Sequence, residues 1–166
     1  MSDTTASESP KKAYSGSCMC KKVRYTVQLA LADPPCFIRC NCTFCTKSGF
    51  DSANIKSLDF HLQAPCSTAE ATSGKTSSRE TLGRFCAPTS PTLFRYFCDK
   101  CGNQIFVAGT YYYEGRPIEH FSINIKLLDQ PQEGLDLSKF KFEYYDGLSD
   151  KYMEKKTDGP YPGGLV

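Results

Sequence analysis

Seven of the ten cysteines stand in three tight clusters along the chain. The clusters are Cys18-x-Cys20, Cys40-x-Cys42-x-x-Cys45 and Cys98-x-x-Cys101. Thiolates at such short spacings are typical ligands of zinc. Two closed zinc sites would need eight thiolates, so seven favour one closed site of four and one open site of three. An open position on a bound metal is where a substrate binds and reacts.

Two of the clusters together suit the closed site. In Cys98-x-x-Cys101 one turn presents both sulfurs to a single ion, and Gly102 can take a positive φ that turns N–H groups toward sulfur. In Cys18-x-Cys20, expected at the start of a strand, both side chains point the same way. Neither pair fills a tetrahedral site alone. We therefore expect the four cysteines to hold a structural zinc that stabilises the fold.

The remaining cluster, Cys40, Cys42 and Cys45, forms a local three-point grip. Its fourth position can take water, a substrate thiol or a distant protein group. Three thiolates donate much charge, so a zinc ion held by them suits a soft incoming thiolate better than it suits hydroxide formation. The alternative is a second closed, purely structural site completed by Cys36, Cys66, Cys86, His61 or His120.

Several neighbours of the open cluster are candidate substrate-binding residues. Thr43 and Phe44 lie between the ligands and should border the metal, and Arg39, Lys47 and Arg95 can hold a substrate carboxylate or balance charge. The two histidines, His61 and His120, offer few general bases, which favours metal–thiol chemistry over hydrolysis. Tyrosines 111–113 either line a pocket or pack within a loop. We interpret Cys36, Cys66 and Cys86 as free thiols, with Cys36 nearest the site.

Alternating apolar and polar residues predict the elements that position these cysteines. Short strands are expected at residues 23–27, 36–40, 58–62, 93–97, 104–108 and 121–125. Residues 46–57 and 159–164 read as loops, the first with a helical turn, residues 66–80 as an exposed hairpin or insertion, and residues 134–140 as a short helix. The pattern predicts a mainly β fold of many short strands joined by loops, with few short helices and with metal clamps among the strands.

Length and composition indicate one globular domain of 166 residues. We expect a disordered arm at residues 1–13, a zinc-binding domain at 14–150 and a tail at 151–166. No secretion signal or membrane span is visible, so a cytoplasmic or nuclear location is expected. Seven thiolates and two zinc ions would shift the formal charge of +2 to about −1, so nucleic-acid binding is not indicated. Edge strands can pair with those of a second copy of the chain, so a homodimer is possible.

The motifs resemble those of one known family. The segments that match are residues 16–20 (GSCMC) with 23–25, residues 40–49 (CNCTFCTKSG) and residues 97–103 (FCDKCGN), within a similarity spanning roughly 14–130. The family is that of the glutathione-dependent formaldehyde-activating enzymes, which includes centromere protein V. Asn41 stands where many relatives carry His, and residues 66–80 are a local departure.

The resemblance implies a β-tent fold of short antiparallel sheets clamped by zinc, with two zinc sites. Zinc would be structural on Cys18, Cys20, Cys98 and Cys101, and open to a ligand on Cys40, Cys42 and Cys45. The activity of the founding members joins formaldehyde to glutathione, formally a carbon–sulfur lyase reaction in reverse.

We therefore expect a carbon–sulfur lyase-type enzyme that binds the thiolate of glutathione, or of a thiol adduct of a small electrophile, at the open zinc. One alternative is a zinc-dependent isomerase or tailoring enzyme that uses the metal as a Lewis acid. Another is a non-catalytic zinc module that binds protein or chromatin.

Overall fold

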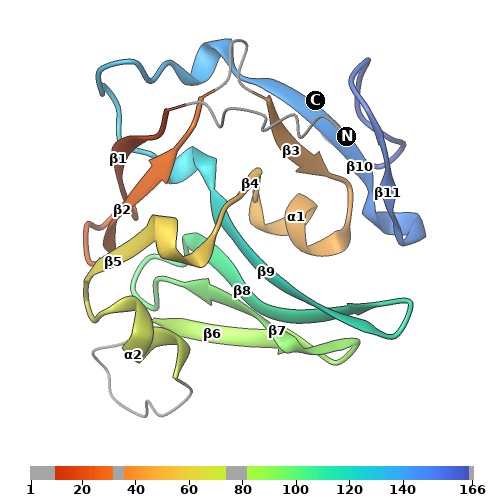
Figure 1. Ribbon diagram of the computed structural model, residues 1–166, viewed down its shortest axis with the longest axis horizontal. Helices are drawn as coiled ribbons and strands as arrows, with labels where there is room; N and C mark the ends of the chain where they lie inside the picture. The colour runs from red at the N-terminus through yellow and green to blue at the C-terminus, as the bar shows by residue number, and fades with distance from the viewer. Residues whose placement is uncertain (1–9, 32–35, 74–81, 165–166) are drawn as a thin grey trace, which may run out of the picture.

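The computed structural model describes residues 10–31, 36–73 and 82–164. In these residues the chain forms two β-sheets joined by short helical segments, which confirms the predicted mainly β class (Figure 1). None of the helices in the described residues is long and apolar enough to cross a membrane.

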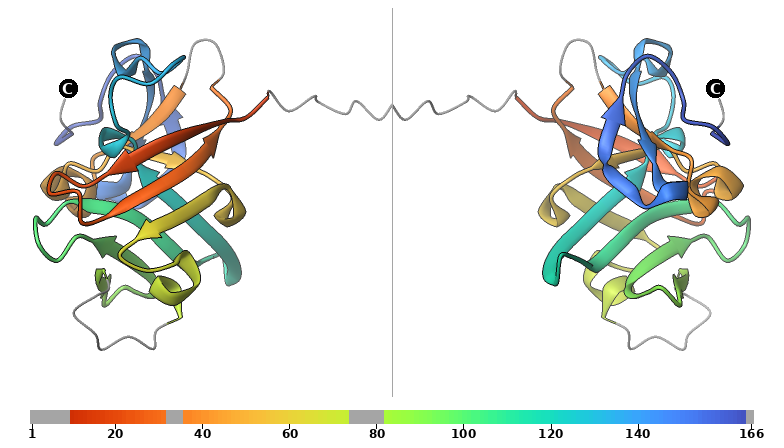
Figure 2. Two further views of the ribbon diagram at one scale, coloured as in Figure 1. Left: turned by 90° about the vertical axis from the view of Figure 1, so that its left-hand side faces the viewer. Right: turned by 90° about the vertical axis from the view of Figure 1, so that its right-hand side faces the viewer.

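The smaller sheet is antiparallel and has the strand order β1-β2-β5. Its strands are β1 (Lys12–Ser17), β2 (Arg24–Leu29) and β5 (Phe60–Ala64). Alternate side chains of β2 and β5 are buried, as the twofold repeat of a strand requires when one face covers the core. This sheet faces the viewer in the left panel of Figure 2, with the larger sheet behind it.

The larger sheet has the order β11-β10-β3-β4-β9-β8-β7-β6. Only β3 and β10 pair in parallel, and the other neighbours are antiparallel. The strands are β3 (Cys36–Cys40), β4 (Ser52–Asn54), β6 (Gly83–Ala87), β7 (Ser90–Phe97), β8 (Gln104–Tyr113), β9 (Arg116–Asn124), β10 (Lys141–Asp146) and β11 (Lys151–Lys156). The β8–β9 hairpin is the longest, and in Figure 1 it extends past α1 beneath β10 and β11.

Helical segments are short and lie between strands. The α-helices are α1 (Thr43–Ser48) and α2 (Thr68–Thr72), and the 3₁₀ turns are η1 (Ser57–Asp59), η2 (Ile125–Leu127), η3 (Leu137–Lys139) and η4 (Gly147–Ser149). Helix α1 matters most for function, because it follows β3 directly and ends at Gly49, whose φ of 64° stops the helix in the left-handed conformation.

The core lies between the two sheets and is largely aromatic. Phe60 of the small sheet stands 5.0 Å from Phe106 and 5.1 Å from Tyr25, measured between ring centroids. Phe106 in turn stacks on Tyr96 at 4.3 Å and on Phe121 at 5.2 Å. Burial of these rings supplies the main apolar contact between the sheets.

Strands extend past both ends of the zinc-binding domain that is expected at residues 14–150. Strand β1 begins at Lys12, inside the segment expected to be a disordered arm, and residues 1–9 lie outside the described residues. Strand β11 occupies Lys151–Lys156, inside the expected tail, and pairs with β10. Both are edge strands, and the polar, lysine-containing composition that suits an exposed edge hides the apolar alternation on which the prediction depended.

Four local expectations also differ from the structure. The expected hairpin or insertion at residues 66–80 contains helix α2, which a capping box of Ser67 and Glu70 starts, and residues 74–81 lie outside the described residues. The expected helix at 134–140 is only the 3₁₀ turn η3. Tyrosines 111–113 continue strand β8, because they pair with β9 across the hairpin. The expected strand at residues 58–62 is shifted to Phe60–Ala64.

Candidate functional site

Two hairpin turns bring the four cysteines of the expected closed site together. Cys18 and Cys20 lie in the turn between β1 and β2, and Cys98 and Cys101 in the turn between β7 and β8. All four sulfurs lie within 4.8 Å of one another, with Cys20 Sγ 3.5 Å from Cys18 Sγ and 3.6 Å from Cys98 Sγ. Sulfurs around a tetrahedral zinc lie about 3.8 Å apart. The donor set therefore fits one zinc ion that would staple the small sheet to the large one.

Polar contacts around this cluster join the same two turns. The amide of Val23 donates to Cys18 Sγ at 3.2 Å, and the amide of Met19 donates to Asn103 Oδ1 at 2.8 Å. An ion pair of 2.6 Å links Lys22 to Asp99. The Cys18-x-Cys20 pair was expected at the start of a strand and instead lies in a turn, where backbone amides can also reach sulfur.

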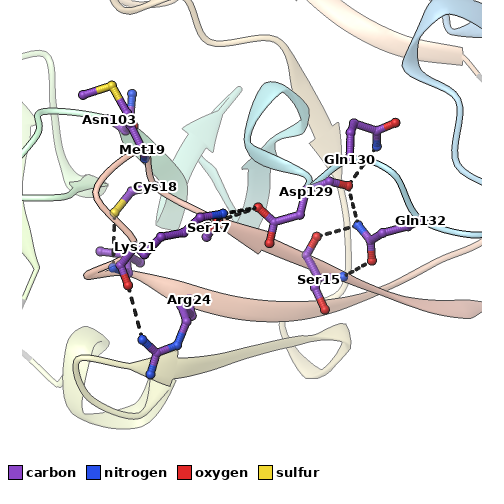
Figure 3. A network of polar contacts seen from close by, with 11 residues as sticks. Ser15, Ser17, Cys18, Met19, Lys21, Arg24, Asn103, Asp129, Gln130 and Gln132 are labelled. Carbon is purple, nitrogen blue, oxygen red and sulfur yellow. Dashed lines mark hydrogen bonds and ion pairs between the residues drawn. The ribbon is translucent and has the colours of Figure 1, made fainter.

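A second network ties the outer edge of β1 to the segment that follows η2 (Figure 3). The side chain of Gln132 brackets Ser15, accepting from its amide at 2.7 Å and donating to its carbonyl at 2.8 Å. Asp129 accepts from Ser17 Oγ at 2.5 Å and from Lys21 Nζ at 3.1 Å. The strand that leads into the four-cysteine site is thus held on both sides.

The three-cysteine cluster forms where β3 passes into α1. Cys40 ends the strand, Cys42 caps the helix by accepting from the amide of Cys45 at 3.5 Å, and the amide of Cys42 donates to Cys40 Sγ at 3.4 Å. The three sulfurs lie within 4.8 Å of one another. Hydrogen bonds from Cys40 and Cys45 lower the pKa of Cys42, whereas hydrogen bonding to Cys40 and Cys42 raises the pKa of Cys45. A cation at the shared centre would let all three ionise.

No fourth histidine, cysteine or carboxylate among the described residues joins this cluster. The alternative of a second closed site therefore finds no ligand among its five candidates, Cys36, Cys66, Cys86, His61 and His120. Cys36 lies at the edge of a different cavity, so it does not approach the site as expected.

The three cysteines open into a cavity of about 720 Å³, which is within the range of small-molecule sites. The cysteine loop contributes one wall and the β7–β9 strands another. The third wall comes from the end of the chain, namely Tyr145, Asp150, Lys151, Tyr152 and Glu154.

The candidate substrate-binding residues differ in whether they line this cavity. Phe44 lines the cavity, whereas Thr43 and Lys47 are exposed and do not line it. Arg39 is also outside the cavity. Its guanidinium forms a 2.7 Å ion pair with the buried carboxylate of Asp51 and stacks 3.9 Å above the ring of Phe142. The strong pairing with Asp51 raises the pKa of Arg39, so we interpret Arg39 as structural rather than substrate-binding.

Arg95 does line the cavity. Its guanidinium lies 5.1 Å from the ring centroid of Phe44 and donates to the carbonyl of Leu93 at 3.0 Å. No carboxylate in the part of the chain that the structure describes forms an ion pair with it. A half-buried guanidinium without a carboxylate partner suits an anionic group of a ligand.

His120 lies in the same cavity. Its Nε2 is 3.0 Å from Ser122 Oγ, and its ring meets Tyr111 edge to face at 5.9 Å. Burial lowers the pKa of His120, and the nearby charge of Arg95 lowers it further. The imidazole is therefore neutral at pH 7 and available to accept a proton. His61, by contrast, is exposed on β5.

Sequence reasoning missed the wall built by the end of the chain. Tyr152 and its neighbours carry no motif, and their strand was expected to be a tail. The cluster of tyrosines at residues 144, 145 and 152 was the available signal, because exposed aromatic residues are frequent in binding sites.

Comparison with known proteins assigns the family. Residues 13–136 match the family model of the glutathione-dependent formaldehyde-activating enzyme. A crystal structure of a Rhodobacter sphaeroides protein is similar at 24% identity and a TM-score of 0.48, covering 75% of this chain and 92% of that chain. No curated protein matches the chain. Because the family match spans most of the chain and all three cysteine motifs, the protein belongs to the family of glutathione-dependent formaldehyde-activating enzymes.

Proposed function

We propose that the protein is a zinc-dependent enzyme of the carbon–sulfur lyase type, which joins the sulfur of glutathione to an electrophilic carbon and can reverse that reaction. The carrying observation is the three-cysteine cluster, which has no fourth ligand among the described residues and opens into a 720 Å³ cavity. Membership in a glutathione-related family supports the same substrate class.

The donor set suits zinc at this position. Three sulfurs within 4.8 Å of one another, two of which accept backbone N–H groups, match a soft divalent ion with one position left open. When bound by Cys40, Cys42 and Cys45, zinc would supply a soft Lewis acid with affinity for a thiolate.

Arg95 would orient the substrate. Glutathione carries two carboxylates, and the guanidinium of Arg95 stands in the cavity beside Phe44, the residue next to Cys45. A charge-assisted hydrogen bond at this half-buried position would fix one carboxylate while the sulfur reaches the cysteine cluster.

His120 would handle the proton. In the addition, the substrate thiol releases a proton to the neutral imidazole, and the sulfur forms a bond to the carbonyl carbon of an aldehyde. The π electrons of the carbonyl move to its oxygen, which takes the proton back from His120. The reaction consumes no oxidant or reductant, and the reverse sequence breaks the same carbon–sulfur bond.

The test is thiol binding to protein loaded with Co²⁺, whose sulfur-to-metal absorption reports a new thiolate. We expect glutathione to bind more tightly than cysteamine, which lacks carboxylates. In Arg95→Met the affinity for glutathione should fall roughly tenfold or more, while that for cysteamine stays the same. Arg84→Met, on the exposed surface of β6, is the matched control and should bind both as wild type does. Unchanged spectra with every thiol would refute the function.

A further inference from the structure

The residue between the first two ligands of the three-cysteine cluster holds the end of the chain. Asn41 is 4% exposed. Its Nδ2 donates to Asp146 Oδ1 at 2.9 Å and to the carbonyl of Pro162 at 3.1 Å, and its Oδ1 accepts from the amide of Leu148 at 2.9 Å. All three hydrogen bonds of this side chain thus go to Asp146, Leu148 and Pro162, none of which lines the cavity.

The same segment comes into direct contact with the cysteine loop. A Cβ atom built on Gly147 would lie 2.5 Å from Cys40 Sγ and 2.7 Å from the Cβ of Cys42, so only glycine fits there. Close packing and the hydrogen bonds of Asn41 fix residues 146–154 relative to the cluster. We call these residues the terminal wall.

The terminal wall carries Tyr152 into the cavity, and Tyr145 of β10 lines it beside the wall. The opposite side is lined by tyrosines 111–113 at the end of β8. Three of these five rings are strongly exposed for aromatic residues, namely Tyr112 at 65%, Tyr113 at 44% and Tyr152 at 49%. Such rings offer flat apolar faces that a ligand in the cavity can cover.

We propose that the terminal wall is a specificity element of the site, and that together with tyrosines 111–113 it selects a planar, aromatic carbon group attached to the substrate sulfur. Asn41 acts as its positioning residue. The wall lies beyond residue 136, where the match to the family model ends, so that match assigns it no role. This inference rests on the proposed function, which places the substrate sulfur at the three-cysteine cluster.

The size and chemistry of the cavity favour an aromatic group over a one-carbon group. A hydroxymethyl group is too small to cover rings on both walls of a 720 Å³ cavity. A benzyl-sized group can stack between tyrosines from both walls. Of the three charged side chains that the terminal wall contributes to the cavity, Lys151 and Glu154 pair with each other at 3.3 Å, which leaves the single charge of Asp150.

The test compares two thioethers that differ only in the carbon group on sulfur. S-benzylglutathione and S-methylglutathione are titrated into the metal-loaded protein by calorimetry, and each also competes with glutathione in the Co²⁺ spectrum. We expect the benzyl compound to bind roughly tenfold more tightly than the methyl compound. Tyr152→Ala and Tyr112→Ala should each lower this benzyl-to-methyl affinity ratio at least threefold, which corresponds to about 0.65 kcal/mol at 298 K.

Two further variants complete the design. Asp146→Ala removes one contact of Asn41 and should lower the ratio as Tyr152→Ala does, although it leaves every ring in place. Tyr161→Ala is the control, since this tyrosine lies on the same terminal segment, packs on Lys156 at 4.7 Å and does not line the cavity. It should leave the ratio unchanged.

The outcomes separate the two proposals. A ratio near one in the wild type, or one that survives Tyr152→Ala and Tyr112→Ala, overturns the aromatic specificity while glutathione binding stands. If glutathione leaves the Co²⁺ spectrum unchanged but the tyrosine-dependent ratio is found, the wall is confirmed and the thiol function fails.

Discussion

Replacing Asn41 by alanine should loosen the terminal wall without removing a metal ligand. Asn41 makes two neutral hydrogen bonds and one to a carboxylate, at 2.9–3.1 Å, from a side chain that is 4% exposed. Neutral hydrogen bonds contribute about 0.5–1.5 kcal/mol each and charged ones about 1.5–3 kcal/mol. Their sum is roughly 4 kcal/mol, and water can replace part of it because Leu148 is 54% exposed.

We therefore expect Asn41→Ala to lower the free energy of unfolding by about 2–3 kcal/mol, or roughly 5–10 °C in Tm for a chain of this size. Denaturant unfolding of the zinc-saturated protein measures the loss, and metal analysis should still find two zinc ions per chain. The amide of Leu148 donates a hydrogen bond to Asn41 Oδ1, so its hydrogen exchange should become faster in the variant.

Thr43→Ala is the matched control, because Thr43 is exposed at the start of α1, two residues after Asn41, and the substitution should cost less than about 0.5 kcal/mol. The reasoning is refuted if Asn41→Ala costs no more than Thr43→Ala, or if exchange at Leu148 is unaffected. Loss of one zinc ion in Asn41→Ala would show instead that the residue shapes the metal cluster itself.

Three further substitutions test other parts of the account. Gly147→Ala should lower the zinc content from two ions to one, because the added methyl group collides with Cys40 Sγ, whereas Leu148→Ala on the same turn should keep both ions. Tyr25→Phe should raise the free energy of unfolding by about 1 kcal/mol, because the buried hydroxyl of Tyr25 has no hydrogen-bond partner among the described residues. Urea denaturation measures the change, and a loss of stability would show that the hydroxyl does have a partner. Arg39→Met should cost about 2–3 kcal/mol of stability, because among the described residues it leaves the buried carboxylate of Asp51 paired with Lys126 alone. The affinity for glutathione should stay unchanged, and weaker glutathione binding by a stable variant would restore Arg39 as a substrate ligand.

The cysteine clusters were readable from the sequence because zinc ligation depends on local spacing. A C-x-x-C turn and a C-x-C-x-x-C loop present their sulfurs together whatever the rest of the fold does, and the structure brings both groups together. The order of strands is not local in this way. The parallel pairing of β3 with β10 joins residues about a hundred positions apart, and no feature of either segment indicates it.

The choice among the three cationic candidates shows the same limit. Arg39, Lys47 and Arg95 all flank a cysteine cluster in sequence, but only Arg95 faces the cavity. Neighbouring residues on a strand alternate between its two faces. The buried Asp51 that pairs with Arg39 lies outside β3, directly before β4. Side-chain direction therefore depended on tertiary packing that spacing alone does not specify.

The terminal wall was hidden for a related reason. Its residues are polar and charged, as suits a strand at the edge of a sheet, so they were interpreted as a tail. What makes them part of the site is contact with Asn41 and with the cysteine loop, both of which lie more than a hundred residues earlier.

The most direct test of the central claim is zinc stoichiometry combined with a glutathione titration. Wild type, Cys42→Ser and the control Cys86→Ser are compared, with Co²⁺ replacing zinc for the titration. We predict two zinc ions per chain in wild type and Cys86→Ser, one in Cys42→Ser, and a spectral response to glutathione that Cys42→Ser abolishes. Two zinc ions that are both inert to glutathione and to other thiols would contradict an open thiol-binding site.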